Sequence, residues 1–533
     1  MPKRILWCAG SLVVLAACVG GPGAARAEDW PQLQHDAART GRTGDTCRPP
    51  FRARWIWLGD DRILRNRESG ADKAGDDKAK WKDDLASRRG HNYDLPKSVP
   101  FCFAGSMQPL ISGGRVFVAD VQGKVYAIAL DDGRTLWRGD LPGGTLWSGA
   151  VAGGAVVFAS LTGVVKAFAP ADGRALWQVD LGKSITSAPA ADDRSVYVAT
   201  HGGVAAAIWL ADGKVRWRCE LEGPVQGGLC LAGGRLYLGS DRMKVYAVRT
   251  DDGTIVAESS VPGQSFRLVW PVAAGERGLF TSVSRVCAGS EYVNDPLLAG
   301  TPGKPVGWKP GIKSGYANAA AEEDAMRSWL ASDGADWETC FALDSRTLKK
   351  DYIIAAGATE GCGASPDPPA LDDQGRPLLW FSTAYPTLTR RGTFGSNFSS
   401  DVSAVDLKTG KRIAIRERFG RLSGQNTETD NLYGLTVGGN MLYLRQNFRG
   451  TFCIDLASSQ GQIISAVCRE RDGGGWQAPI NYVQGHIKDD ALTVARLPAH
   501  PPAPQGRLGP AVTAGRLVFT EYFCVTCVEG VGE

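Results

Sequence analysis

Residues 124–137 read KVYAIALDDGRTLW, two apolar runs joined by an Asp-Gly turn. The Asp-Gly pair returns at an unvarying interval of 40 residues, at Asp132-Gly133, Asp172-Gly173, Asp212-Gly213 and Asp252-Gly253. A tryptophan follows the first three pairs at the same offset, at Trp137, Trp177 and Trp217, and Ala257 ends this series. A fixed period of this length is typical of repeat architectures.

Each repeat is expected to consist of strands. Asp-Gly between two apolar runs is a strong hairpin signal, because a primed turn needs positive φ at its central positions. The apolar runs do not alternate with polar residues, so both faces of each small sheet should be covered. A β-propeller of four-stranded antiparallel blades meets this need, and the recurrent Trp is large enough to fill the seam between blades.

The unit Val125-Tyr126-Ala127-Ile128, followed by Asp132-Gly133 and Trp137, resembles the pyrroloquinoline-quinone-like (PQQ-like) repeat family. The start of the sequence, Asp29-Trp30-Pro31-Gln32 and Arg39-Thr40-Gly41, is similar to that of envelope proteins with this propeller. Degenerate third strands are expected at residues 341–344, 403–406 and 452–455. Residues 515–520 and 523–528 would begin a last blade that residues 54–57 complete, which gives eight blades, with seven as the alternative.

The sequence predicts a signal peptide at residues 1–27 and a propeller at 28–533. Two insertions interrupt the propeller: a charged one at 60–98, and one at 288–338 that contains the helix-forming residues 319–332. Residues 5–19 are apolar but too short to span a membrane. Ala25-Arg26-Ala27 is a small-x-small cleavage site, whereas Leu15-Ala16-Ala17-Cys18 resembles a lipobox that would place a lipid anchor on Cys18. Export to the periplasm, in soluble or lipid-anchored form, is expected by either route.

Charge excludes one class of partner. Removal of residues 1–27 takes away three basic and no acidic residues, which lowers the formal net charge from +4 to +1. This balance provides no global field for nucleic acid or for anionic lipid.

The 13 cysteines fit an exported protein. Neighbours in sequence suggest the disulfides Cys219–Cys230, Cys340–Cys362 and Cys453–Cys468, although connectivity cannot be deduced from sequence. Cys524 and Cys527 have redox or zinc spacing without a second pair, so a disulfide or simple strand cysteines are expected. An odd number leaves at least one thiol unpaired, with Cys287 a candidate.

No motif indicates catalysis or a resident metal. The five histidines, at positions 35, 91, 201, 486 and 500, lack metal-ligand spacing. Gly182-Lys183-Ser184 imitates the end of a phosphate loop, but Trp177 stands where its first Gly would be.

The resemblance implies two kinds of function. One is a noncatalytic scaffold of the bacterial envelope, without a cofactor, that binds another protein or an extended peptide. The other is a quinone-dependent alcohol or sugar dehydrogenase, which would hold PQQ and calcium over the axis of the propeller. The adjacent cysteines that often flank the quinone are missing from this sequence. A third possibility is glycan binding through insertion aromatics such as Trp308, Trp329 and Trp337.

Overall fold

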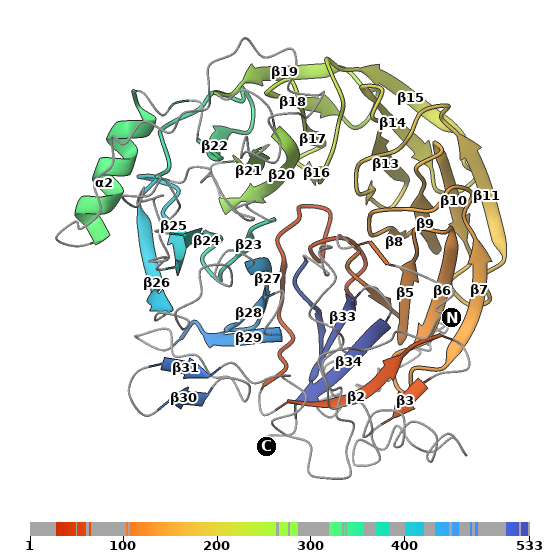
Figure 1. Cartoon of the computed structure of the whole chain (residues 1–533). Helices are drawn as coiled ribbons and strands as arrows, with labels where there is room; N and C mark the ends of the chain where they lie inside the picture. Colours follow the sequence, from red (N-terminus) through yellow and green to blue (C-terminus); the bar gives the residue numbers. More distant parts are fainter. Residues whose placement is uncertain are drawn as a thin grey trace, which may run out of the picture.

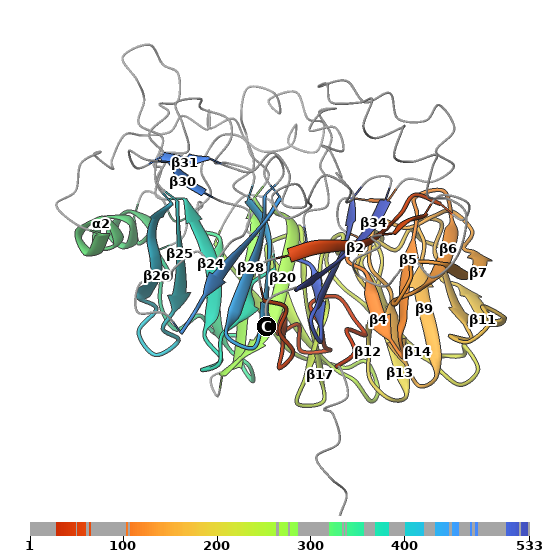
Figure 2. The same ribbon diagram turned by 90° about the horizontal axis from the view of Figure 1, so that it is seen from below.

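The computed structural model of the chain describes residues 28–48, 51–59, 63–65, 103–104, 107–262, 266–275, 278–285, 319–332, 335, 338–355, 368–382, 400–419, 432–446, 450–457, 469–471, 475–477, 508–521 and 524–530. Its sheets are arranged in a ring around a central axis (Figure 1), and their strands run roughly along that axis (Figure 2). The fold is therefore an all-β propeller with four-stranded antiparallel blades and a short helix at its rim.

Four regular blades come from the 40-residue repeats. The first contains β4 (Leu110–Ser112), β5 (Arg115–Ala119), β6 (Lys124–Ala129) and β7 (Thr135–Asp140). The second contains β8 (Ala150–Ala152), β9 (Ala155–Ala159), β10 (Val164–Phe168) and β11 (Ala175–Asp180). The third contains β12 (Ala190–Ala191), β13 (Ser195–Ala199), β14 (Val204–Trp209) and β15 (Val215–Glu220). The fourth contains β16 (Cys230–Ala232), β17 (Arg235–Ser240), β18 (Lys244–Arg249) and β19 (Ile255–Ser260).

The remaining sheets are less regular. One has the three strands β20 (Phe266–Ala274), β21 (Gly278–Arg285) and β22 (Cys340–Asp344). The next has β23 (Ala370–Leu371), β24 (Pro377–Ser382), β25 (Ser400–Val405) and β26 (Arg412–Phe419). Another has β27 (Leu432–Gly438), β28 (Met441–Gln446) and β29 (Gly450–Asp455), to which β1 (Arg42–Thr43) adds in parallel. A separate hairpin pairs β30 (Arg469–Arg471) with β31 (Gly475–Gln477).

The two ends of the chain close the ring together. β32 (Ala511–Thr513), β33 (Arg516–Glu521) and β34 (Cys524–Gly530) form a sheet with β2 (Phe51–Trp57) and β3 (Ile63–Arg65) from the N-terminal region. Trp55 of β2 pairs with Cys527 of β34. The predicted completion of the last blade by residues 54–57 is confirmed. Among the described residues, seven sheets of the ring have four or five strands and one has three.

A Trp-Gly contact joins neighbouring blades. The indole Nε1 of Trp177 in β11 donates to Leu210 O of the next blade at 2.7 Å. A Cβ on Gly213 would lie only 2.8 Å from Trp177 Cδ2, and the φ of Gly213 is +74°, which glycine adopts without strain. The same contact joins Trp55 to Gly133, Trp137 to Gly173, and Trp217 to Gly253. The structure thus places the recurrent Trp and Gly residues in the seams.

Two other seams use different residues in the same places. Tyr352 occupies the Trp place against Gly410, and its hydroxyl donates to Leu407 O. At the seam after the fourth blade, Ala257 stands where the Trp would be, and the turn opposite carries Leu348, which is fully buried with a φ of +55°. Both belong to one apolar cluster, so the large side chain has moved from the strand to the turn. This exchange explains why the Trp series ends at Ala257.

The outer strands of the four regular blades share a bulge. In the second blade Ala167 pairs with Trp177 and Phe168 pairs with Ala175, so Leu176 is an extra residue. The corresponding extra residues of the other blades are Leu136, Arg216 and Val256. A bulge bends and twists the strand locally, which makes an exposed edge a poor template for a further strand.

The predicted helix exists as α2 (Ala319–Leu330). It lies on the outer rim (Figure 1), where Arg327 donates to Ile353 O and to Gly410 O, and Glu323 accepts a hydrogen bond from Arg412 N. Trp329 packs with Met326, Leu330 and Ala355. The helix thus covers the seam that contains Tyr352. Within the described residues, no helix is long and apolar enough to cross a membrane.

The expected disulfides are not present among the described cysteines. Cys219 lies in an outer strand, and Cys230 lies in the innermost strand of the next blade, so the expected bridge between them is wrong. Cys524 and Cys527 are three residues apart in β34, where side chains alternate between faces, and both are simple strand thiols. Cys340 and Cys453 are buried free thiols, and their expected partners, Cys362 and Cys468, lie outside the described residues, as do Cys18 and Cys287.

Candidate functional site at the axial mouth

Residues 28–47, called the axial segment, run through the middle of the ring (Figure 1). The segment contacts the innermost strand of one sheet after another. Pro31 O accepts from Val151 N of β8 at 2.7 Å, and Thr40 O accepts from Leu371 N of β23 at 2.7 Å. Corresponding backbone bonds reach Ile111 of β4, Leu231 of β16, Ala273 of β20, Val437 of β27 and Gly515 beside β33. The Gln32 side chain adds β12, since it exchanges two hydrogen bonds of 2.9 Å with Ala191. The axial segment therefore joins all eight sheets.

Arg39 anchors the second half of the axial segment. Its guanidinium group is buried and donates to three backbone carbonyls: Leu33 O at 2.7 Å, Pro189 O at 2.6 Å and Leu229 O at 2.6 Å. Burial lowers the pKa of Arg39 to about 10, so the group is still charged at neutral pH. These bonds tie the segment to the third and fourth blades.

A second buried network of hydrogen bonds holds the first half of the axial segment, around Trp30 and Gln34. Gln108 Oε1 accepts from Trp30 Nε1 at 3.0 Å and from Gln34 N at 2.7 Å. Gln34 Nε2 donates in turn to Leu435 O at 3.1 Å. All three side chains have relative exposures of 1% or less. The axis is thus filled by protein side chains at this level.

A pocket of about 360 Å³ opens where the segment enters the ring. Its wall combines segment residues with the turn between β23 and β24, and the lining residues are Glu28, His35, Thr40, Arg42, Thr43, Gly44, Leu371, Asp372, Asp373 and Gly375. Acidic, basic and hydroxyl side chains are mixed in this wall. The pocket suits a small polar group.

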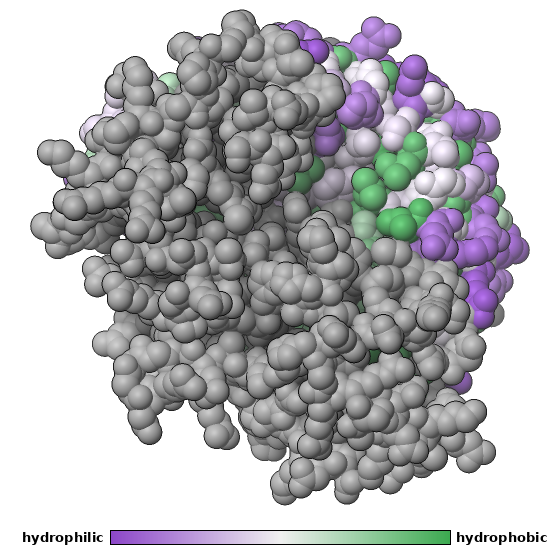
Figure 3. Space-filling model, viewed as in Figure 1, coloured by the Kyte–Doolittle hydropathy of each residue, from purple (hydrophilic) through white to green (hydrophobic). Residues whose placement is uncertain are grey.

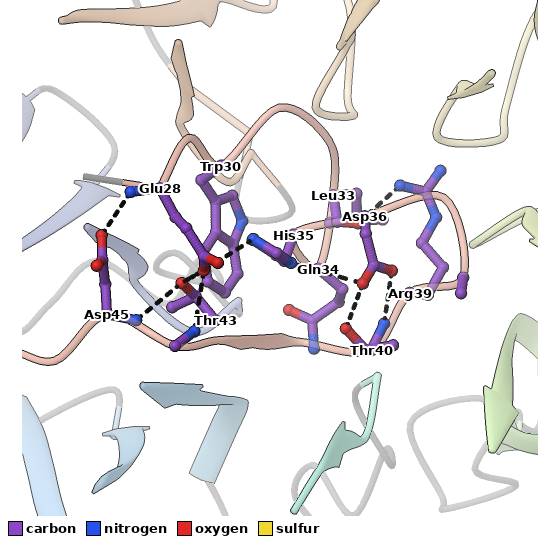
Figure 4. Close-up of polar contacts among 12 residues, drawn as sticks. Glu28, Trp30, Leu33, Gln34, His35, Asp36, Arg39, Thr40, Thr43 and Asp45 are labelled. Atoms are coloured by element: carbon purple, nitrogen blue, oxygen red, sulfur yellow. Dashed lines mark hydrogen bonds and ion pairs between the residues drawn. The ribbon is translucent and has the colours of Figure 1, made fainter. Parts of the chain in front are cut away.

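His35 lies between two carboxylates at the pocket (Figure 4). Its Nε2 is 4.0 Å from Glu28 Oε2 and its Nδ1 is 3.5 Å from Asp36 Oδ2, and its ring packs edge-on against Trp30 at 4.9 Å. Gln34, His35 and Arg39 have φ values of +53°, +73° and +62°. Positive φ in non-glycine residues costs free energy and persists where the surroundings enforce it. The dense contacts of the axial segment provide that enforcement.

Both carboxylates beside His35 are held in the ionised form. The hydrogen bond from Thr43 is the main reason that the pKa of Glu28 lies below its usual 4.5. Burial opposes ionisation of Asp36, but His35 and Thr40 more than offset it, so the pKa of Asp36 is also lowered. Thr40 N donates to Asp36 Oδ1 at 3.0 Å and closes the strained turn.

A quinone does not fit at this end of the axis, because the buried side chains of Trp30, Gln34 and Arg39 fill it and are hydrogen-bonded to the surrounding protein. Within the described part of the chain, no group of three or more His, Cys, Asp or Glu residues could hold a metal ion. The arrangement can position a polar ligand at the mouth, and it holds the ring together from within.

The sequence-based candidates lie elsewhere. His201 is in an exposed turn of the third blade, and Lys183 is in the turn that imitates a phosphate loop. His91, His486, His500, Trp308 and Trp337 lie outside the described residues. Sequence reasoning recognised the start of the axial segment by its resemblance but did not place it in the axis. The signal was its Trp-Pro and Arg-Thr-Gly pattern ahead of the first repeat.

The family model described as "Outer membrane protein assembly factor BamB" matches residues 70–164 and 161–307. The matched residues, which include the four regular blades, therefore have repeats of the PQQ-like type, and the match spans less than half of the chain. A search of curated proteins found no match. Similar solved structures include the computationally designed Ika8 protein, with 12% identity, a TM-score of 0.47 and coverage of 81% of this chain and 96% of that chain.

Two natural proteins are also among the similar structures. BamB from Moraxella catarrhalis has 14% identity and a TM-score of 0.45, with 80% of this chain and 95% of that chain covered. A europium-containing methanol dehydrogenase has 12% identity and a TM-score of 0.48, with coverage of 84% and 86%.

Proposed function

We propose that this PQQ-like propeller is a noncatalytic, exported scaffold that binds another protein, or an extended peptide of one, in the bacterial cell envelope. The family model that matches the regular blades carries the description of an outer-membrane assembly factor, which supports this class of function. We also count the three-stranded sheet as an eighth blade, because Leu343 bridges to Lys350 and gives that sheet the beginning of a fourth strand.

The observation that carries the proposal is the axial segment. It occupies the axis with the chain's own side chains and bonds to each of the eight described sheets of the ring, so the ring is held rigidly and its contacts with other molecules fall to the surrounding faces. A rigid frame loses little conformational entropy on binding. The described surface in Figure 3 is hydrophilic along the outer rim and has a hydrophobic area further inward.

Affinity capture from envelope extract tests the proposal. The intact protein with a cleavable C-terminal tag should retain a specific envelope protein after in-cell crosslinking and a high-salt wash. A chain with the same tag but with Arg39→Met, which loosens the ring, should retain less of it. Recovery of polysaccharide in place of protein would favour the glycan-binding alternative.

The dehydrogenase alternative has its own assay. The purified protein is incubated with PQQ and calcium, and dye reduction is followed with alcohols and sugars as substrates. We expect no turnover above that of the cofactor alone. Robust, protein-dependent turnover would contradict the noncatalytic proposal.

A further inference from the structure

We propose that the chain is cleaved between Ala27 and Glu28 and that Asp45 binds the α-ammonium group released on Glu28. The inference rests on the proposed export. Glu28 N lies 2.7 Å from Asp45 Oδ2, beside the pocket that Glu28 and Gly44 help to line. In the uncleaved chain this nitrogen is an amide with one N–H. Hydrolysis breaks the Ala27–Glu28 C–N bond, water supplies hydroxide to the Ala27 carbonyl carbon and a proton to the nitrogen, and the amine takes up a further proton.

Glu28, the first residue that the structure describes, is bonded through all of its polar groups. Its carbonyl oxygen accepts from Thr513 Oγ1 at 2.9 Å, and its carboxylate accepts from Gly44 N at 2.9 Å and from Thr43 Oγ1. Asp29 continues the attachment, because its carboxylate accepts from Ser112 Oγ at 2.7 Å and from Gly113 N at 3.1 Å. Every polar group of Glu28 is therefore engaged by the folded ring, and the nitrogen faces a carboxylate.

The sequence before Glu28 contains a cleavage pattern at this position. Ala25-Arg26-Ala27 provides the small-x-small pattern that leader-removing proteases recognise. Cleavage converts an N–H···O⁻ bond of an amide into a charge-assisted bond between an ammonium and a carboxylate, which is shorter and stronger. Since Glu28 opens the axial segment and Asp45 lies near its end, the ion pair would tie the two ends of that segment together. Lipidation at Cys18 would leave ten residues before Glu28 and keep its nitrogen an amide.

The first test is the N-terminus of the full-length chain expressed in a bacterium that exports it. Intact mass and N-terminal sequencing of the protein from periplasmic and membrane fractions should give Glu28 as the first residue. A lipidated Cys18, or any other exported N-terminus, would overturn the cleavage inference but leave the proposed export standing. A chain that keeps Met1 in the cytoplasm would refute export itself, and with it the envelope function.

The second test isolates the ion pair. Two mature chains are prepared by cleaving a fusion protein, one that begins at Glu28 and one that begins at Ala27, and Asp45→Asn is introduced into each. Asp45→Asn should lower the Tm of the chain that begins at Glu28 by more than that of the longer chain, and 1 M salt should reduce this difference. Equal losses in both chains would refute the capture of the ammonium group.

A matched control keeps this test specific. Asp251 is exposed in the turn between β18 and β19, its backbone oxygen accepts from Arg216, and among the described residues its carboxylate has no hydrogen bond to Glu28. Asp251→Asn should change the Tm of the two chains equally. If Asp251→Asn lowered the Tm of the chain that begins at Glu28 more than that of the longer chain, the effect would arise from net charge. That result would also count against the inference.

Discussion

At the scale of single residues, the propeller depends on large-to-small contacts across its seams. Trp177 is 9% exposed, and its ring lies on the bare backbone of Gly213. Tyr352 with Gly410 preserves this arrangement with a smaller ring. Leu348 with Ala257 reverses it. The requirement is therefore a filled seam, and either side of the seam can supply the volume.

Removal of a seam tryptophan should be costly. Trp177→Ala removes a buried ring and the hydrogen bond to Leu210 O, and should lower the free energy of unfolding by about 3–5 kcal/mol. Urea denaturation followed by circular dichroism would measure the loss. Trp209 is a suitable control because it is 37% exposed and contacts Arg216 at 4.1 Å, so Trp209→Ala should cost about 1 kcal/mol or less. Equal losses would contradict the seam argument.

The reversed seam permits an exchange experiment. Ala257→Trp alone should overpack the seam against Leu348 and cost about 1–3 kcal/mol. Leu348→Gly alone should leave a cavity, although it relieves a positive φ. The double variant restores the arrangement of the other seams, so a double-mutant cycle should give a favourable coupling energy of about 1–3 kcal/mol. Additive effects would show that the two residues do not share one space.

At the scale of elements, the axial segment links the described sheets of the ring to one another by hydrogen bonds. Its bonds are made to backbone groups of inner strands, so it recognises their positions more than their side chains. The outer strands, in contrast, carry the bulge residues Leu176 and Val256 at exposed edges. Each regular blade is thus bonded to the axial segment at its inner edge, and at its outer edge the bulge disfavours pairing with a further strand.

The Arg39 anchor should be essential to the element. Arg39→Met keeps much of the side-chain volume but leaves three buried carbonyls without their donor, so the free energy of unfolding should fall by about 3 kcal/mol or more. Hydrogen exchange should rise in β8, β12 and β16 as the segment loosens. Arg42→Met, in the same segment but at the pocket wall, should have little effect. A similar loss in both variants would refute the anchoring role.

The stability of the protein should depend on the ionised carboxylates beside His35 and should therefore fall in acid. The folded state lowers the pKa of Glu28 and of Asp36, so their contribution to stability is complete above their usual values of 4.5 and 3.8 and is lost as the pH falls through the lower folded values. Tm measured from pH 7 to pH 3 should therefore decrease below about pH 4.5. Asp36→Asn should flatten part of this decrease. An unchanged pH profile in that variant would contradict the assignment.

At the scale of the whole molecule, the ring is closed by the pairing of β2 with β34, and the thiols that the structure describes are buried. Seven described cysteines are buried and free. Burial raises the pKa of Cys230, Cys340 and Cys527 to about 12 in each case, which suppresses the reactive thiolate. Alkylation of these seven cysteines should therefore be slow in the native protein and accelerate with urea.

Thiol labelling can then report whether the ring opens at its closure. Trp55→Ala, which removes the contact of β2 with Gly133, should speed alkylation of Cys527 more than that of Cys230. Mass spectrometry of labelled peptides would resolve the two sites. Uniform acceleration would show that the ring unfolds as one unit and does not open at this blade.

The sequence was sufficient for the repeats and insufficient for the axis. The Asp-Gly turns predict the strands and the recurrent Trp residues predict the seams, because both sequence patterns are local and periodic. The positions of Gln34 and Arg39 could not be predicted in the same way, because their partners, such as Leu435 and Leu229, are 401 and 190 residues distant in sequence. Proximity of cysteines in sequence also misled, since a blade connection carries the chain from the outer edge of one sheet to the inner edge of the next.

The axial segment has a consequence for the order of assembly. The axial segment precedes every blade in the sequence and contacts all of them. During synthesis, each new inner strand can therefore bond to an axial segment that has already been made. The blades can therefore assemble one after another around the axial segment. The first residues of the segment complete their hydrogen bonds only when the last blade, which contains Thr513, has formed and the ring is closed.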